Sequence, residues 1–322
     1  GWWSSPDLQA FCDFLRHDND ALYDGFPGMY FMRAFERLRH WMNTNTKTQA
    51  KKNISYHYDL GNAFYSLWLD DTMTYSSAIF ETGQESMEDA QIAKYASMVD
   101  QMGVKSGDHV LEIGCGWGGF AEYAAKERGL KVTGLTISEE QLKFAKERID
   151  KAELSHMVNF KLQDYREETA TYDGIASIEM FEAVGEKYWP VYFEAVRDRL
   201  KPGAKATLQI ITLTEERFEQ YRKSVDFIQK YIFPGGFLPS ITALSQNFTE
   251  HTSLVIESID DIGLDYAKTL AHWRDNILAA WSELTQFGYD EQFKRLWLYY
   301  LAYCEGAFIE RATSTVQVVA RK

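Results

Sequence analysis

Closely spaced glycines are the residues with the clearest chemical use in this chain, because they directly follow an apolar segment. Residues 110–120 read VLEIGCGWGGF, and a helical pattern begins where this segment ends. A backbone that turns from strand to helix beside a ligand needs positive φ angles and no Cβ atom, and glycine meets both needs. The spacing therefore predicts a site for a nucleotide-like cofactor.

The same glycines fit two cofactor patterns. Gly114, Gly116 and Gly119 match the GxGxxG of dinucleotide sites, whereas Gly114, Gly116 and Gly118 match the GxGxG of methyltransferases. A dinucleotide domain usually places an acid about 20 residues further on, at the end of the next strand, to bind the ribose hydroxyls. Here that strand ends in Leu135 and Thr136, which counts against NAD.

Composition limits the class of protein. The 322 residues are 45% hydrophobic and 15% aromatic, which suits one large α/β domain with additions. The three cysteines, Cys12, Cys115 and Cys304, are widely spaced and favour neither a disulfide framework nor a metal cluster. We therefore expect no metal site and a cytoplasmic location. No apolar run reaches the roughly 18 residues that span a bilayer.

The charge distribution argues for some classes of binding partner and against others. A formal net charge of −13 argues against nucleic acid, which binds through Lys and Arg. Residues 33–52 differ, because basic side chains alternate there with apolar ones. Such a stretch predicts peripheral contact with anionic lipid at the inner face of a membrane, and an ordinary surface helix fits the pattern equally well. The sequence leaves a homo-oligomer open.

Alternating strands and helices must position the glycines. We expect residues 1–105 to form a helical N-terminal segment and substrate entrance, and residues 106–322 to form the cofactor domain. The alternation indicates a parallel sheet with right-handed crossovers. The expected strands are 110–113, 131–135, 158–162, 174–178 and 206–211, and the expected helices between them are 119–128, 139–150 and 188–199.

Beyond residue 211 the alternation stops. A helix over 215–232 lies in a helical insert of about 213–250, which we expect to form a lid. A sixth strand near 253–259, helices over 266–287 and 290–309 within a helical region of 266–310, and an alternating strand at the C-terminus complete the pattern. Five parallel strands followed by a final strand pair predict the Rossmann-like, seven-stranded sheet of class I methyltransferases.

Several motifs occur in the same order as in one known family. They are YHYDLGN at Tyr56, TYSSAIF at Thr74, LEIGCGWGG at Leu111, GLTIS at Gly134, IEMFEAVG at Ile178, IFPGGFLPS at Ile232 and DYAKTL at Asp265. On these motifs the chain resembles the cyclopropane fatty acid synthases, including the mycolic acid cyclopropane synthases, from about residue 53 to the C-terminus. The resemblance implies methyl transfer from S-adenosylmethionine to double bonds of unsaturated phospholipid acyl chains.

The resemblance also assigns the cofactor residues. The matching positions in this sequence are Tyr75, Ser76, Gly114, Gly116, Leu135, Thr136, Gln141, Asp164, Tyr165 and Ile178. Thr136 and Gln141 offer neutral hydrogen bonds to ribose, and Asp164 with Tyr165 can pair with and stack on adenine. Each residue also has a structural alternative to cofactor binding. For example, Thr136 could cap a helix and Tyr165 could be a core aromatic.

The family is associated with a bound bicarbonate ion that removes a proton so that the cyclopropane ring closes. The corresponding positions here are Ser77, Glu182, Gln209, Ile211 through its carbonyl, and Tyr266. Ser77 replaces a cysteine and Gln209 replaces a histidine, which removes the group able to become charged near pH 7. His57 is expected in a structural network, and Cys304 as a buried apolar residue.

Three alternatives stay open at this point. Failure to close the ring would give a methylated alkene, as in the formation of furan fatty acids. Plant alkaloid N-methyltransferases resemble this family too, so a small amine is a second acceptor class. A protein that binds S-adenosylmethionine without turnover is the third.

Overall fold

The structure, a computed structural model, describes residues 5, 7–11, 49 and 60–322. Residues 8–11 are helical, in agreement with the start of the predicted N-terminal helices. The rest of those helices, nearly all of the basic apolar segment 33–52, and His57 lie outside the described residues. The proposed membrane-contact segment therefore stays a prediction.

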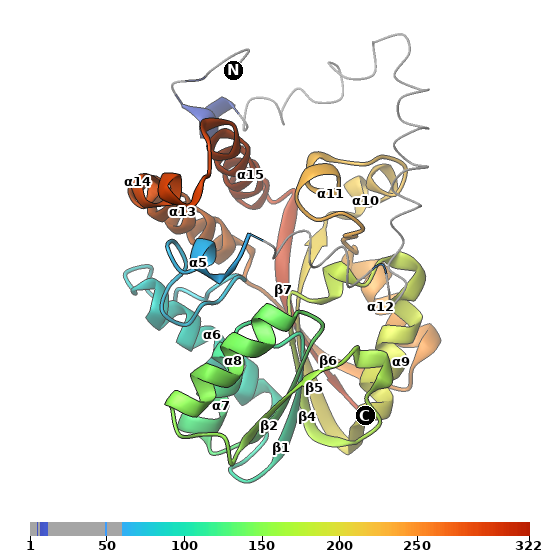
Figure 1. Cartoon of the computed structure of the whole chain (residues 1–322). Coiled ribbons are helices and arrows are strands. Elements are labelled where there is room, and N and C mark those ends of the chain that lie inside the picture. Colours follow the sequence, from blue (N-terminus) through green and yellow to red (C-terminus); the bar gives the residue numbers. More distant parts are fainter. Residues whose placement is uncertain (1–4, 6, 12–48, 50–59) are drawn as a thin grey trace.

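A seven-stranded sheet of order β3-β2-β1-β4-β5-β7-β6 forms the centre of the molecule (Figure 1). Its strands are β1 (His109–Ile113), β2 (Lys131–Thr136), β3 (Val158–Leu162), β4 (Tyr172–Ile178), β5 (Leu200–Leu213), β6 (Val255–Asp261) and β7 (Thr313–Arg321). The first five strands pair in parallel, and β7 runs antiparallel between β5 and β6. The predicted Rossmann-like fold of the class I methyltransferases is confirmed.

Helices cover both faces of the sheet (Figure 1). The first face carries α6 (Met87–Met102), α7 (Gly119–Arg128) and α8 (Glu139–Lys151), whose buried side chains share one core cluster with β1 and β2. The opposite face carries α9 (Trp189–Arg199) and α12 (Ile241–His251), in a second cluster with β4, β5 and β7. Central strands buried on both faces explain the nearly continuous apolar runs in the sequence.

Helix α6 shows how the sequence both guided and misled the prediction. Ser86 caps it by accepting a hydrogen bond from the backbone N–H of Asp89, as its position before the apolar pattern suggests. The apolar spacing over residues 86–102 predicts a helix with Ile92 on its buried face, but Ile92 is 38% exposed. Gln91 and Lys94 are instead fully buried on that face, because their polar ends bind each other beneath the cavity described below.

The insert is more broken than the periodicity predicted. The prediction of one helix over 215–232 is wrong, since the structure has two helices there, α10 (Glu215–Tyr221) and α11 (Phe227–Tyr231). The break is fixed by Asp226, which forms a reciprocal capping box with Gln229 and so starts a new helix. Helix α12 lies between α11 and β6, and the sequence analysis did not predict it as a separate helix.

An aromatic helical layer stands at the carboxyl ends of the strands. It consists of α5 (Asn62–Tyr65), α13 (Gly263–Ala279), α14 (Trp281–Leu284) and α15 (Glu291–Ile309), which share a core cluster rich in Trp, Tyr and Phe. One helix was predicted over 266–287. The structure divides this segment into α13, which ends at Ala279, and the short helix α14. Among the described residues, no helix is long and apolar enough to cross a bilayer.

Candidate active site

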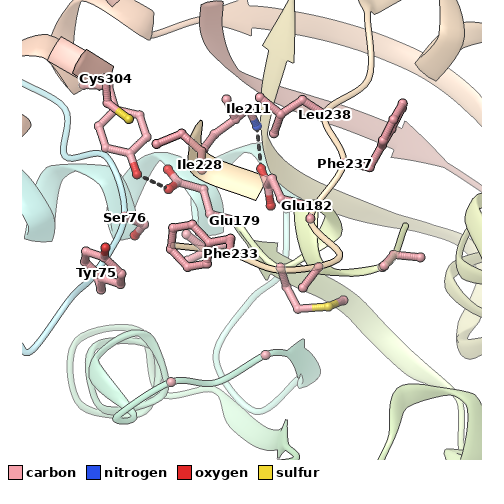
Figure 2. Close-up of a pocket in the computed structure, with 18 of the residues that line it drawn as sticks. Tyr75, Ser76, Glu179, Glu182, Ile211, Ile228, Phe233, Phe237, Leu238 and Cys304 are labelled. Carbon is pink, nitrogen blue, oxygen red and sulfur yellow. Dashed lines mark hydrogen bonds between the residues drawn. The ribbon is translucent and has the colours of Figure 1, made fainter. Parts of the chain in front are cut away.

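A cavity of about 480 Å³ opens at the carboxyl ends of β1, β2, β4 and β5. Its walls come from the sheet edge, the insert and helices α13 and α15, so residues far apart in sequence meet there (Figure 2). Ligands of open α/β sheets bind at this edge. The predicted residues that line it are Tyr75, Ser76, Gly114, Gly116, Leu135, Thr136, Gln141, Asp164, Tyr165, Ile178, Glu182, Ile211 and Tyr266.

The glycine turn after β1 follows the GxGxG pattern. Gly114, Gly116 and Gly118 have φ angles of 84°, 49° and 85°, whereas Gly119 lies in the first turn of α7 without a positive φ. A Cβ atom at Gly114 would lie 2.7 Å from Cγ of Met180, but one at Gly116 would meet nothing within 4 Å. Gly116 therefore borders open space in the cavity.

Neutral polar groups follow at the end of β2. The Thr136 hydroxyl donates to Oε1 of Gln141 at 2.9 Å and accepts from the backbone N–H of Ser138 at 3.1 Å. This arrangement orients the Gln141 amide and leaves its Nε2 as a donor. The capping alternative for Thr136 is wrong, because Ser138 is the N-cap of α8 and accepts from the backbone N–H of Gln141. Thr136 instead holds the Ser138 N–H and positions a cavity residue.

The turn after β3 holds the predicted adenine pair. Both carboxylate oxygens of Asp164 accept from the Arg166 guanidinium, at 2.7 and 2.6 Å, and one also accepts from the Arg166 backbone N–H. Tyr165 lies against Tyr192 with ring centroids 5.5 Å apart. The Asp164 side chain is therefore held rigidly at the cavity wall, with Tyr165 beside it.

Aromatic rings form the opposite wall. The Tyr75 hydroxyl shares a hydrogen bond of 2.7 Å with that of Tyr300, and its ring lies 5.1 Å from Trp273 and 6.4 Å from Phe233. The Ser76 hydroxyl accepts a hydrogen bond of 2.7 Å from Nζ of Lys94. Such a wall excludes water and presents ring faces with negative potential.

Two carboxylates reach the cavity after β4 (Figure 2). Glu182, on the short helix η2 (Phe181–Ala183), accepts a hydrogen bond of 2.6 Å from the backbone N–H of Ile211. Its second oxygen is buried without a hydrogen-bond partner among the described residues. Glu179 accepts a hydrogen bond of 2.7 Å from the Tyr266 hydroxyl.

Ser77 and Gln209 do not line the cavity, although they were predicted beside the reacting atoms. Both are completely buried behind Glu179, where the Ser77 backbone N–H and the Gln209 amide each donate to its Oε1 at 2.8 Å. The Ser77 hydroxyl itself donates to the carbonyl of Ala78. The structure thus brings Ser77, Gln209 and Tyr266 together around a carboxylate that sequence reasoning did not single out.

The sequence reading missed two charged groups, the half-buried Glu179 and the fully buried Lys94. Glu179 directly follows β4 within the same motif as Glu182, and this position at the strand end was an available signal. Lys94 falls on the apolar stripe of α6, which was a signal of a buried charge. Burial lowers the pKa of Lys94 to about 7, and its charge stabilises ionised Glu179.

The environments of the two cavity carboxylates differ. Burial raises the pKa of Glu182 to about 8, and the negative charge of Glu179 adds to that rise. Burial also raises the pKa of Glu179, but hydrogen bonds from Gln209, Ser77 and Tyr266 oppose the rise. Three donors therefore surround the Glu179 carboxylate, whereas Glu182 has one, the backbone N–H of Ile211.

Similarity to known proteins extends over most of the chain. Residues 45–318 match a family model described as mycolic acid cyclopropane synthetase. The cyclopropane-fatty-acyl-phospholipid synthase of Escherichia coli is 38% identical over 323 residues, which cover 99% of this chain and 80% of that protein. The tuberculostearic acid methyltransferase UfaA1 of Mycobacterium tuberculosis is 37% identical over 316 residues, or 96% of this chain and 73% of that protein.

Solved structures agree with the sequence matches. Mycolic acid cyclopropane synthase CmaA1, complexed with SAH and CTAB, superposes with a TM-score of 0.79 at 27% identity, over 84% of this chain and 98% of that one. Coclaurine N-methyltransferase superposes with a TM-score of 0.74 at 18% identity, which shows a shared fold.

Proposed function

Since the chain belongs to the mycolic acid cyclopropane synthetase family and is an S-adenosylmethionine-dependent methyltransferase, we propose that it methylates double bonds of unsaturated phospholipid acyl chains. The observation that carries this proposal is the wall of aromatic rings beside two half-buried carboxylates at the carboxyl edge of the sheet. An apolar chain can enter such a cavity, and a carbocation formed there is shielded from water.

The cofactor residues fit S-adenosylmethionine. Gly116 leaves room for a ligand against the backbone, Gln141 offers an amide donor, and the ring of Tyr165 flanks the far end of the site. S-adenosylmethionine supplies an electrophilic methyl group on a sulfonium. The chain's task is to hold that methyl group close to an alkene, because an isolated double bond is a weak nucleophile.

The aromatic wall has the next task. When the π electrons of the alkene form a bond to the methyl carbon, the neighbouring carbon becomes cationic. Ring faces of Tyr75, Phe233 and Tyr300 stabilise such a cation through their quadrupoles without forming a bond to it. The backbone N–H of Phe237, in the insert, donates to the carbonyl of Glu182. This hydrogen bond holds the insert next to the carboxylates.

Ring closure is the proposed outcome. Removal of a proton from the added methyl group leaves an electron pair that bonds to the cationic carbon and forms a cyclopropane. A methylated alkene is the second candidate product, supported by the 37% identical relative that is named a methyltransferase. Both outcomes need a base in the acceptor part of the cavity.

The test uses vesicles that contain a cis-unsaturated phospholipid, together with S-adenosylmethionine carrying a ¹³C-labelled methyl group. We expect the label in the acyl chain, with upfield cyclopropane signals in the NMR spectrum. A labelled methyl group bonded to a chain with a retained double bond, without cyclopropane signals, would show that an alkene forms instead of the ring. Label found only on an added small amine, with none in lipid, would contradict the proposed acceptor. Sedimentation with anionic vesicles tests the proposed contact with a membrane surface.

A further inference from the structure

The groups that the family resemblance assigns to bicarbonate do not fit a bound anion in this chain. The Gln209 amide, the Tyr266 hydroxyl and the Ser77 backbone N–H all donate to the Glu179 carboxylate. The Ser77 hydroxyl donates to the carbonyl of Ala78, and Glu182 accepts from the backbone N–H of Ile211. The donors are therefore already used by a side chain. A bicarbonate ion placed among them would also lie beside the negative charge of Glu179, and like charges at contact distance repel strongly.

We propose that the Glu179 carboxylate is the base that takes the proton from the methylated acyl cation, so that turnover needs no bicarbonate. The inference rests on the proposed function, because it names the group that completes the same reaction. A C–H bond of the added methyl group breaks, its electron pair forms the new carbon–carbon bond, and the proton moves to a Glu179 oxygen. Product exchange then releases that proton to solvent.

The hydrogen bonds leave one side of Glu179 available to the substrate. Oε1 accepts from the backbone N–H of Ser77 and from Nε2 of Gln209, whereas Oε2 accepts only from Tyr266 among the described residues. An ionised carboxylate has about four acceptor positions. The remaining position belongs to Oε2, and Glu179 lines the cavity next to the aromatic wall (Figure 2).

A chain of amides fixes the direction of the Gln209 donor. Oε1 of Gln209 accepts from Nε2 of Gln317 at 3.0 Å, and Oε1 of Gln317 accepts from Ser97 and Gln101, each at 2.7 Å. Gln209 and Gln317 are paired across β5 and β7. The amide of Gln209 therefore presents its NH₂ group to Glu179, which makes Gln209 and Gln317 positioning residues for the carboxylate.

The backbone of Glu179 supports a functional role. Its φ angle is 48°, in the left-handed region that residues other than glycine rarely adopt. Backbone strain of this kind gathers at functional sites, where the surroundings enforce it. Here the Glu179 backbone N–H donates to the carbonyl of Gln209 at 2.9 Å, so the strained turn is tied to the same strand that supplies the amide donor.

The first experiment compares Glu179→Gln with a matched control, Glu127→Gln, which changes an exposed carboxylate on α7. We expect Glu179→Gln to lower kcat by about 10²- to 10⁴-fold, the usual contribution of a general base, and to leave the affinity for S-adenosylhomocysteine within about twofold. Glu127→Gln should match the wild type in both. Near-normal kcat for Glu179→Gln would overturn the inference.

The second experiment uses Glu179→Gly, because glycine suits the positive φ and removal of the side chain frees the donors for an anion. Binding of ¹³C-labelled bicarbonate to the complex with S-adenosylhomocysteine is followed by NMR. We expect binding to Glu179→Gly and none to the wild type, together with partial rescue of turnover by added bicarbonate in the variant. Equal binding of bicarbonate to both proteins would overturn the inference.

These readouts separate two kinds of failure. A wild type that labels no phospholipid under any condition would refute the proposed acceptor, whereas the bicarbonate comparison would still decide which anion the donors hold. A wild type that labels phospholipid only after bicarbonate is added would refute the role of Glu179 and support the acceptor.

Discussion

In the part of the cavity that we propose binds the cofactor (the cofactor half), formed by Gly114, Gly116, Thr136 and Gln141, the chain uses backbone and neutral polar groups. In the part that we propose binds the acceptor (the acceptor half), formed by Glu179, Glu182, Tyr266 and the aromatic wall, it uses half-buried carboxylates with a fully buried lysine, Lys94, beneath them. The first half has only to bind and orient a ligand. The second must also accept a proton, and a buried charge is stable there only because donors surround it.

The largest effect on binding is expected when a larger side chain is introduced into the cofactor half. Gly116→Val places a branched side chain at a φ of 49° in the open part of the cavity, so we expect about 100-fold weaker binding of S-adenosylhomocysteine by calorimetry. Gly103→Val is the control, because Gly103 has a φ of 68° with no neighbours within 4 Å and ends α6. Equal weakening by both would assign the effect to general destabilisation.

A change in the acceptor half should leave binding intact and alter the chemistry. Tyr266→Phe removes the donor to Oε2 of Glu179, and we expect kcat to fall about tenfold with unchanged cofactor affinity. The Tyr266 hydrogen bond lowers the pKa of Glu179, so its loss raises that pKa. Because Glu179 acts in its ionised form, the acidic limb of the kcat profile should move to higher pH.

That pH profile also reflects the charges that face Glu179. They are Lys94 below it and Glu182 beside it. If the acidic limb of the kcat profile has the same midpoint in Tyr266→Phe as in the wild type, a group other than Glu179 controls that limb. Gln209→Leu, which removes a different donor to Glu179, should move the limb in the same direction.

A smaller effect is expected from the positioning chain. Gln317→Leu removes the partner that orients the Gln209 amide, so kcat should fall about threefold while KM for the phospholipid stays unchanged. Gln101→Leu, one contact further from Glu179, should have a weaker effect still. A larger effect of Gln101→Leu than of Gln317→Leu would contradict the proposed order of contacts.

The smallest effect on turnover is expected at Glu112, where the readout is stability. Burial raises the pKa of this carboxyl to about 8, so the folded state retains a proton that the unfolded chain releases from about pH 4.5 upward. Stability from this group is therefore present at low pH and is lost as the pH rises toward 8. Glu112→Gln should lose less stability than the wild type between pH 5 and pH 8 in urea unfolding.

The cofactor half was predictable because its signals are local. The glycine spacing and the non-acidic end of β2 lie within one β-turn-α-β unit, and the structure brings Gly114, Gly116, Thr136 and Gln141 to one cavity. Their contact with the cofactor stays a prediction. The five parallel strands and the final strand pair also followed from the alternating pattern. The division of the insert into α10 and α11 depended on one capping residue, Asp226, which periodicity alone does not reveal.

The acceptor half was only partly predictable, because its contacts join residues distant in sequence. Glu179 and Tyr266 are 87 residues apart, and Gln209 and Gln317 are 108 apart. Motif matching marked Ser77, Gln209 and Tyr266 but gave no direction for their donors. Only the folded arrangement shows that they converge on Glu179 rather than on an open anion site.

The most direct test of the central claim is the dependence of wild-type turnover on bicarbonate. Methyl transfer to cis-unsaturated phospholipid vesicles is measured in buffer freed of carbon dioxide and again after bicarbonate is added. If Glu179 supplies the base, the two rates should agree within about 20%, well inside the 10²-fold or larger contribution of a general base. A rate that collapses without bicarbonate and returns when it is added would contradict the account.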